Sequence, residues 1–273
     1  MFTNTKKSFV QSSWHLQIIL LLILLTACEN PITGLGPRPS YIDKHKHKPM
    51  LNVFGVLRPD VRNGMPMSYV HLEQAWAYSY FPDTTRVTDA SVKLFEYEGS
   101  TIVNTIALSY TNFDSAFPTS EYRHPDFYPI AGHTYGISCF KQGYPELTSR
   151  TTVPSVPKIV DDAIQVNPNN ISFSIMRDSL AALYDVYLII GQQAYADRIQ
   201  QPEAGDIAVK LAIEAASESA GLLIIYAYDL QLSEYITYNV IIKTNSYRSD
   251  YSTVDNGFGC FGSLNIFSKM ITL

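Results

Sequence analysis

Positive charge is scarce in this sequence. Lysine and arginine supply 20 side chains against 25 from aspartate and glutamate, which leaves a formal net charge of −5. A surplus of acidic residues provides no basic face for nucleic acid, so we expect no nucleic-acid partner. Charged residues of both signs make up only 16% of the chain, whereas hydrophobic residues make up 46%. A chain of this composition can bury sizeable cores and lacks the low hydrophobicity of a disordered protein.

Long hydrophobic runs are also missing. The run from 18 to 25 has eight residues, whereas a membrane-spanning helix needs roughly 20. Lys6 and Lys7 precede this run, and Leu25-Thr26-Ala27 leads into Cys28. A charged start, an apolar middle and a small-residue cleavage site together predict a secretory signal. An ordinary signal peptide and an uncleaved helical anchor are the alternative interpretations.

The residues that lead into Cys28 resemble a bacterial lipobox. The resemblance implies that residues 1–27 are a lipoprotein signal peptide and that the mature chain begins at Cys28. The thiol of Cys28 would then carry a diacylglycerol with palmitate-type acyl chains. The expected localisation is the outer membrane, on the cell surface or the periplasmic face. Glu29 favours the cell surface, because acidic residues at this place in Bacteroidota-like lipoproteins accompany surface display.

Only two cysteines remain once Cys28 is assigned to the lipid. Cys139 and Cys260 are about 120 residues apart and fall in different predicted domains. An exported protein could form one disulfide from them. We favour two buried and unpaired thiols, because free cysteines usually behave as small hydrophobic residues.

The sequence lacks the motifs of common hydrolases. Neither the H-E-x-x-H zinc helix nor the G-x-S-x-G serine elbow occurs in it. Cys260 with His133 or His124 as its base would make a thiol nucleophile, but the surrounding residues match no cysteine-hydrolase signature. Asp161 and Asp162 lack the spacing of a calcium loop. We therefore expect no enzymatic activity, no metal site and no cofactor.

Gly257, Gly259 and Gly262 reproduce the letters of the dinucleotide-binding fingerprint G-x-G-x-x-G. That mechanism requires a strand before the glycines and a helix after them, and only eleven residues follow Gly262. We interpret the segment as a structural closure of the second domain. The glycines would permit positive φ and close backbone approach, and Phe258 and Phe261 would be buried.

Aromatic residues are abundant, with 19 Tyr and 13 Phe. Together with many Thr, Val and Ile they fit a pleated, half-buried surface. The predicted fold class is all-β, with two β-sandwich-like domains. Residues 28–48 contain prolines, glycines and a Lys/His run without periodicity. They are predicted to be a flexible tether after the lipidated cysteine.

Alternation with a period of two defines a first domain at residues 49–155. It predicts strands at 51–57, 70–80, 90–98, 101–108, 135–139 and 147–153. The turn residues Glu98-Gly99-Ser100 indicate a hairpin between two of these strands. Short strands with turn signals at this spacing are typical of a β-sandwich. The residues expected in its core are Val70, Leu72, Trp76, Tyr135 and Ile137.

A second β-rich domain is predicted at residues 156–273, after the linker between Pro154 and Pro157. Alternation predicts strands at 171–175 and 184–190, and an apolar strand at 222–228. Residues 203–220 are ambiguous, because their alanine-rich composition suits a helix. The alternation of Ile207, Val209, Leu211 and Ile213 favours a strand there. The last strong β pattern runs from Tyr235 to Ile241.

Three motifs of the first domain resemble a known fold. Asp89-Ala-Ser-Val-Lys-Leu-Phe-Glu is followed by Ala131-Gly-His-Thr-Tyr-Gly-Ile-Ser-Cys-Phe-Lys-Gln-Gly-Tyr-Pro and by Thr151-Thr-Val-Pro. Their order resembles the transthyretin-like or carboxypeptidase-regulatory β-sandwich. With the glycine-rich segment from Asn256, the chain resembles an uncharacterised family (a domain of unknown function) of Bacteroidota outer-membrane lipoproteins. The spacing at Asn256-Gly257 departs from that family's pattern.

The resemblance implies a partner rather than a reaction. Members of that family look like accessories of TonB-dependent outer-membrane receptors. We therefore expect a lipid-anchored binding protein that helps such a receptor capture or hand over a nutrient. The alternative is a structural or adhesive surface lipoprotein with no small-molecule ligand. The candidate ligand-contact aromatics are Trp76, Tyr80, Tyr122 and Tyr128.

Overall fold

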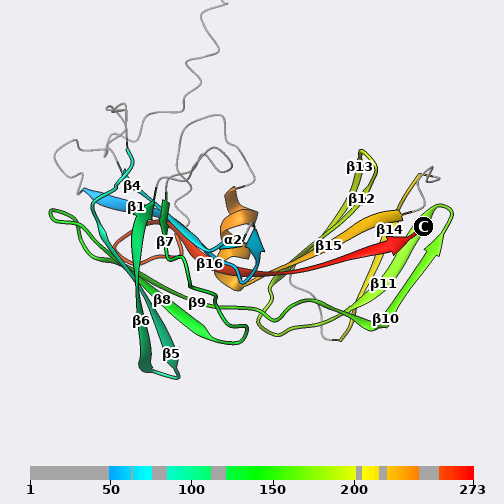
Figure 1. Ribbon diagram of the computed structural model, residues 1–273, viewed down its shortest axis with the longest axis horizontal. Coiled ribbons are helices and arrows are strands. Elements are labelled where there is room, and N and C mark those ends of the chain that lie inside the picture. The colour runs from blue at the N-terminus through cyan, green and yellow to red at the C-terminus, as the bar shows by residue number, and fades with distance from the viewer. Residues whose placement is uncertain are drawn as a thin grey trace, which may run out of the picture. The chain divides into compact units, whose positions relative to one another are not determined.

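The computed structural model describes residues 49–62, 64–75, 85–111, 121–200, 205–214, 220–239 and 252–273. The predicted signal peptide, Cys28 and the tether lie outside the described residues, as do Trp76 and Tyr80. Where the chain is described it is nearly all β, with sixteen strands and one helix (Figure 1). The prediction of an all-β fold is confirmed.

The first half of the chain supplies nine strands. They are β1 (Met50–Leu57), β2 (Val61–Arg62), β3 (Met65–Pro66), β4 (Tyr69–Ala75), β5 (Ser91–Glu98), β6 (Thr101–Thr111), β7 (Glu121–Arg123), β8 (Thr134–Phe140) and β9 (Leu147–Thr152). The predicted hairpin is confirmed, because β5 and β6 pair in antiparallel fashion around the turn at Gly99. Gly99 has a φ of 61°, which a side chain would oppose.

The second half supplies seven strands and the helix. They are β10 (Lys158–Asn167), β11 (Asn170–Met176), β12 (Leu183–Ile190), β13 (Gln193–Gln200), β14 (Ile207–Ala212), β15 (Ala220–Tyr228), α2 (Leu230–Asn239) and β16 (Gly257–Thr272). The strand interpretation within 203–220 is confirmed for β14, whose buried Ile207, Val209 and Leu211 alternate with exposed residues.

One sheet of eleven strands runs through both halves, in the order β13-β12-β15-β16-β1-β4-β7-β6-β5-β8-β9. A three-stranded sheet has the order β10-β11-β14, and β2 pairs with β3. The edge strand β9 contacts the residues that precede β16. Thr148 and Asp255 form a β-bridge, and Ser149 Oγ donates a hydrogen bond to the Thr253 carbonyl at 2.7 Å. The residues inside this curved part form the first core.

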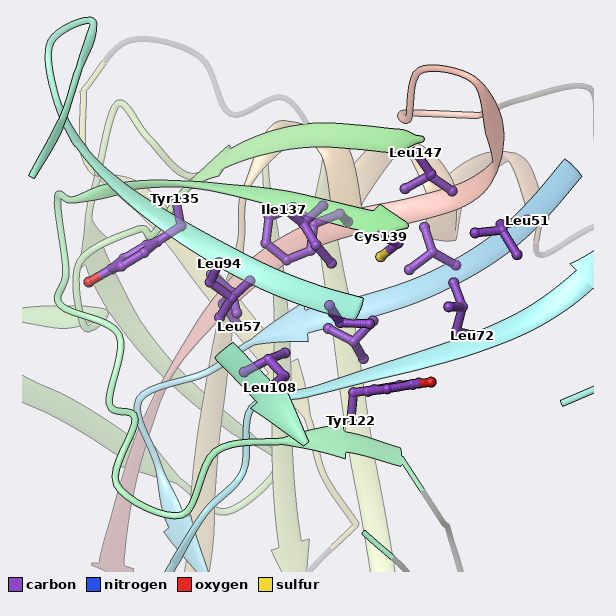
Figure 2. Close-up of a cluster of buried hydrophobic side chains, with 14 of the residues drawn as sticks. Leu51, Leu57, Leu72, Leu94, Leu108, Tyr122, Tyr135, Ile137, Cys139 and Leu147 are labelled. Carbon is purple, nitrogen blue, oxygen red and sulfur yellow. The ribbon is translucent and has the colours of Figure 1, made fainter. Parts of the chain in front are cut away.

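The first core is built from the alternating apolar residues of these strands (Figure 2). Val70, Leu72, Tyr135 and Ile137 are buried in it, as the alternation predicts. Its other buried members are Leu51, Val53, Leu57, Val87, Val92, Leu94, Leu108, Tyr122, Phe127, Cys139, Leu147, Val153 and Phe261.

The second core lies between the three-stranded sheet and the strands β12, β15 and β16. Ile171, Phe173 and Ile175 of β11 contribute one side, and Val186, Leu188, Leu223 and Ile225 contribute the other. Packing of two sheets through their inner faces is the sandwich arrangement. The two cores divide the chain between Val153 and Ile159, near the predicted boundary, except for β16. The two-domain division itself stays a prediction, because Lys48–Leu273 forms one compact unit.

Strand β16 belongs to both cores. Its first part pairs in parallel with β1, from Gly257 opposite Leu51 to Ser263 opposite Leu57. Its second part, from Leu264 to Thr272, pairs in antiparallel fashion with β15. The interpretation of Gly257–Gly262 as closure of the second domain is therefore wrong, because this segment completes the first core.

The aromatic residues of this segment differ in burial. Phe261 is fully buried in the first core, whereas Phe258 is only half-buried. The prediction that both are buried is therefore confirmed only for Phe261.

The glycines of β16 allow close backbone approach, as predicted. A Cβ on Gly259 would lie 1.9 Å from the carbonyl oxygen of Val53, and the residue has a φ of 102°. A Cβ on Gly262 would lie 2.6 Å from Cβ of Leu232 in α2. Side chains at these two positions would push β16 away from β1 and from the helix.

The β pattern predicted from Tyr235 is wrong where the structure describes it, since α2 spans Leu230–Asn239. The helix begins after Asp229, whose carboxylate accepts a hydrogen bond from the Leu232 amide at 2.9 Å. Such a cap stabilises a helix start. Leu232, Tyr235 and Ile236 then pack on Val56, Cys260 and Leu264 of the sheet. The residues from 240 to 251 lie outside the described part.

Candidate functional site

Two of the four candidate ligand-contact aromatics can be located. Tyr122 is 2% exposed, its hydroxyl accepts a hydrogen bond from the Ala90 amide at 2.9 Å, and its ring meets Tyr110 edge-on. The assignment of Tyr122 to a ligand surface is therefore wrong, because the ring is a core residue. Tyr128 is 45% exposed and keeps its candidate role as a prediction. Trp76 and Tyr80 lie outside the described residues.

A different set of side chains makes an apolar surface that is half-buried or exposed. At one end of it, Tyr226 and Ile266 pack against the buried cluster that contains Leu232 of α2. Along β12 and β15, every second residue faces the second core, and the residues between them face the opposite way. On β15 the latter, from Leu222 to Tyr228, are apolar or aromatic and half-buried rather than polar. We call the set the outer apolar face, and its members are Tyr187, Ile189, Leu222, Ile224, Tyr226, Ile266 and Met270.

The strand register places these side chains in rows across three strands. Ile189, Leu222 and Met270 form one row. Tyr187, Ile224 and Ser268 form the next row. Tyr226 and Ile266 follow in the third row. Met270 is 63% exposed and Ile189 is 37% exposed. The outer face of an antiparallel sandwich sheet is normally polar, so a contiguous apolar one indicates a contact surface.

The tyrosines of this face do not form a flat platform. The rings of Tyr187 and Tyr226 have centroids 5.9 Å apart and meet at 85°. Tyr226 and Tyr228 are stacked at 6.1 Å with an interplanar angle of 25°. Because adjacent rings alternate between edge-on and stacked, the face offers no row of coplanar rings. It is an irregular surface of aromatic and aliphatic side chains.

One ion pair lies within the tyrosines. Asp185 is 3% exposed, and both of its carboxylate oxygens accept hydrogen bonds from Arg198, at 2.6 and 2.7 Å. The hydroxyl of Tyr228 also approaches this carboxylate, and burial together with the negative charge raises the tyrosine pKa. The bidentate pair neutralises both charges. The face therefore presents no net charge to a partner.

A buried carboxylate connects this region to the first core. Asp229 is 2% exposed and joins β15 to α2. Its carboxylate accepts a hydrogen bond from the Thr151 hydroxyl, which lies 2.8 Å from the Ser263 hydroxyl. Burial raises the pKa of Asp229 to about 6, although hydrogen bonds from Thr151 and the backbone oppose the increase. The group holds β9, β16 and α2 together.

The candidate thiol nucleophile and its candidate bases have different partners. Cys260 Sγ lies 3.6 Å from the Gln231 carbonyl, and burial raises its pKa to about 12. His133 Nδ1 lies 2.6 Å from Glu96 Oε1, and His124 Nδ1 accepts the Asp126 amide at 3.1 Å. A thiol that stays protonated at neutral pH is a poor nucleophile, so the structure does not assemble a thiol–imidazole site.

Both remaining cysteines are buried and unpaired, as favoured above. Burial also raises the pKa of the Cys139 thiol. Asp162 pairs with Lys269 Nζ at 2.6 Å instead of contributing to a calcium loop. Within the described ranges, no group of three metal-ligating side chains occurs. No helix in that part of the chain is long and apolar enough to cross a membrane.

The outer apolar face can be recognised in the sequence, although not from the alternation of apolar and polar residues. Residues 222–228 are all apolar or aromatic, so both faces of this strand carry such side chains. Such a continuous run is typical of a strand that is covered on both faces. The second core covers one face. On the other face, Tyr226 and Tyr228 pack against the cluster of Leu232, Cys260 and Leu264, and Leu222 and Ile224 remain as a half-buried surface.

Comparison with known proteins identifies no relative by sequence. No family model matches the chain, and no curated protein matches it. Among solved structures, the FN1–FN3 domains of chicken CNTN1 are similar over 65% of this chain and 60% of that chain, with 11% sequence identity and a TM-score of 0.28. At this level of similarity the match carries no argument about fold or function.

Proposed function

We propose that this protein is a lipid-anchored binding protein of the outer membrane and an accessory to a TonB-dependent nutrient receptor. Cys28 attaches it to the membrane, and the outer apolar face docks on the receptor. The observation that carries the proposal is the outer apolar face. Its Tyr, Met, Ile and Leu residues, with a neutralised arginine, have the composition of a protein interface core, from which lysine and glutamate are depleted.

The absence of a flat aromatic platform favours a protein partner over a sugar. A protein surface can follow the alternating edge-on and stacked rings of Tyr187, Tyr226 and Tyr228. Met270 adds an adaptable side chain at the rim. A receptor surface that matches this face should be apolar and uncharged.

Native gel electrophoresis of detergent-solubilised outer membranes tests the docking. The wild-type protein should migrate together with a TonB-dependent receptor. Ile224→Lys, in the middle of the outer apolar face, should abolish this comigration because it places an unpaired charge in the interface. Phe140→Lys is the matched control, since Phe140 is 53% exposed on β8 outside this face. Migration of the wild type alone, or equal behaviour of both variants, contradicts the proposal.

The anchor is tested separately. The intact mass of the membrane-bound protein should equal that of a chain that begins at Cys28 and carries acyl chains. Cys28→Ala should release the protein into the soluble fraction, because stable anchoring depends on the acyl chains. A Cys28→Ala protein that stays fully membrane-bound would overturn this part of the proposal.

A further inference from the structure

Strand β6 has an open edge. On one side, β5 pairs with it from Thr101 to Leu108. On the other side, β7 pairs with it only from Ser109 to Thr111. Among the described residues, the stretch from Thr101 to Leu108 therefore has no strand on its second side. The β5–β6 hairpin is visible at the lower left of Figure 1.

The local sequence explains why β7 stops where it does. Arg123 pairs with Ser109, and Pro125 follows two residues later. Proline has no amide hydrogen to donate to a ladder. The next residues form a turn in which His124 accepts the Asp126 amide. The chain thus leaves the sheet and exposes the edge of β6.

This edge lacks the charges that protect other edges of the molecule. No residue of β6 is charged, and Ile102 and Val103 are each 49% exposed. In contrast, β13 carries Asp197 and Arg198, and β10 carries Lys158, Asp161 and Asp162. Natural edge strands are usually guarded by charged residues, since a bare edge is a template for an added strand.

We propose that the edge of β6 from Asn104 to Leu108 binds an extended segment of a partner protein as an added β-strand. The added strand lies in line with β7 and forms main-chain hydrogen bonds with β6. Such strand addition takes its affinity from the backbone and its specificity from alternate side chains. This site is separate from the outer apolar face and does not depend on the function proposed for that face.

The geometry excludes a second copy of the same strand. A two-fold pairing centred on Ile106 would bring the second copy beside Ser109, where Arg123 already lies. A pairing centred on Asn104 would cross the irregularity in the β5–β6 register between Glu96 and Tyr97. A bulge there changes which face the side chains occupy. The occupant is therefore a separate, short segment.

The neighbouring side chains define the chemistry of that segment. Leu108 is 8% exposed, and Ile106 on the same face packs against the first core. The added strand needs apolar side chains toward this face. Thr105 and Ala107 on the other face are small and exposed, so they accept polar or small residues. Glu96, which accepts a hydrogen bond from Asn104 at 3.5 Å, disfavours an acidic segment.

Hydrogen exchange with a model strand tests the inference. The probe is the peptide acetyl-Thr-Val-Thr-Val-Thr-Val-Thr-amide, added to the full-length protein. Exchange of β6 amides between Asn104 and Leu108 should slow by at least about tenfold at millimolar probe, because the added strand excludes water from them. Two further probes carry N-methyl groups on the odd-numbered or on the even-numbered residues of the peptide. They show which peptide amides donate hydrogen bonds to β6. The probe whose methyl groups replace the donating amide hydrogens should give no protection of β6.

A pair of variants localises the effect. Ala107→Lys places a charge on the β6 edge and should remove the protection. Ala196→Lys, at an exposed alanine of the edge strand β13, should leave it intact. Protection at β13 or β10 instead of β6, equal binding by both N-methylated probes, or no protection at 1 mM probe would each overturn the inference.

Discussion

Strands β5 and β15 occupy equivalent places in the two halves of the molecule. Each is central in its part of the sheet, and each buries alternate residues in a core, Val92 and Leu94 for β5 and Leu223 and Ile225 for β15. Their other faces differ. On β5 the residues between the buried ones are exposed Ser91 and Lys93, followed by half-buried Phe95 and Tyr97.

The aromatic residues of the two strands also have different neighbours. Tyr97 of β5 lies under the Arg150 guanidinium at 4.0 Å. On β15, the corresponding face carries Leu222, Ile224, Tyr226 and Tyr228, and its tyrosines touch other tyrosines. The outer face of β5 thus mixes polar and aromatic residues, whereas that of β15 is apolar or aromatic throughout. Because the two faces differ within one chain, overall composition alone does not account for the outer apolar face.

The largest expected effect comes from breaking the strand that the two halves share. Gly259→Ala should lower the free energy of unfolding by at least about 4 kcal/mol, because its Cβ would overlap the Val53 carbonyl. Gly143→Ala is the control, since Gly143 also has positive φ (+88°) but nothing within 4 Å of the added atom. It should cost only about 1–2 kcal/mol. Denaturant titration measures both, and similar losses would contradict the close approach of β16 and β1.

A smaller loss should follow from emptying the position that β16 fills in the first core. Phe261→Ala should cost about 3–5 kcal/mol, as for other buried phenylalanines. Phe140→Ala, at a 53% exposed position, should change stability by no more than about 0.5 kcal/mol. Equal melting temperatures for the two variants would show that Phe261 is not a core residue.

The buried carboxylate between the halves should make stability depend on pH. The folded pKa of Asp229, about 6, lies above its ordinary value of 3.8. Its contribution to stability is therefore fully present below about pH 4 and is lost as the pH rises through 6. The difference of about two pKa units corresponds to roughly 3 kcal/mol.

Asp229→Asn removes this titration but keeps an acceptor for the Leu232 amide. Relative to the wild type, the variant should gain stability between pH 4 and pH 7. The single variant Thr151→Val should make the free energy of unfolding depend more strongly on pH. The Thr151 hydroxyl favours the ionised carboxylate, so its loss raises the pKa of Asp229 further. Parallel stability curves for Asp229→Asn and the wild type would contradict the burial of this charge.

The smallest effect is expected on the outer apolar face. Met270→Ser should change the free energy of unfolding by no more than about 0.5 kcal/mol, because 63% of the side chain is already exposed. Thermal unfolding of the isolated protein measures this. A loss of 2 kcal/mol or more would mean that Met270 is part of a core and not of a surface.

Local patterns in the sequence predict most of the strands. The alternation at 51–57 and the turn at Gly99 are local signals, so β1 and the β5–β6 hairpin are found from the sequence. Helix α2 is missed because Tyr235, Thr237 and Asn239 also alternate. The Asp229 cap and the packing of Leu232 on Cys260 decide its conformation, and the latter contact joins distant residues.

The candidate site is less predictable for the same reason. The sequence around a tyrosine has the same pattern whether its ring lies inside or outside, as fully buried Tyr122 and 45% exposed Tyr128 show. The parallel pairing of β16 with β1 leaves no local trace either, because its partners are far apart in the sequence.

The place of β16 also sets the order in which the protein can fold. Leu51 and its partner Gly257 are separated by about 200 residues, a span that makes folding slow and dependent on late contacts. Neither core is complete until residues 257–272 are available. A chain that is synthesised from its N-terminus therefore cannot complete its fold until this last strand is present.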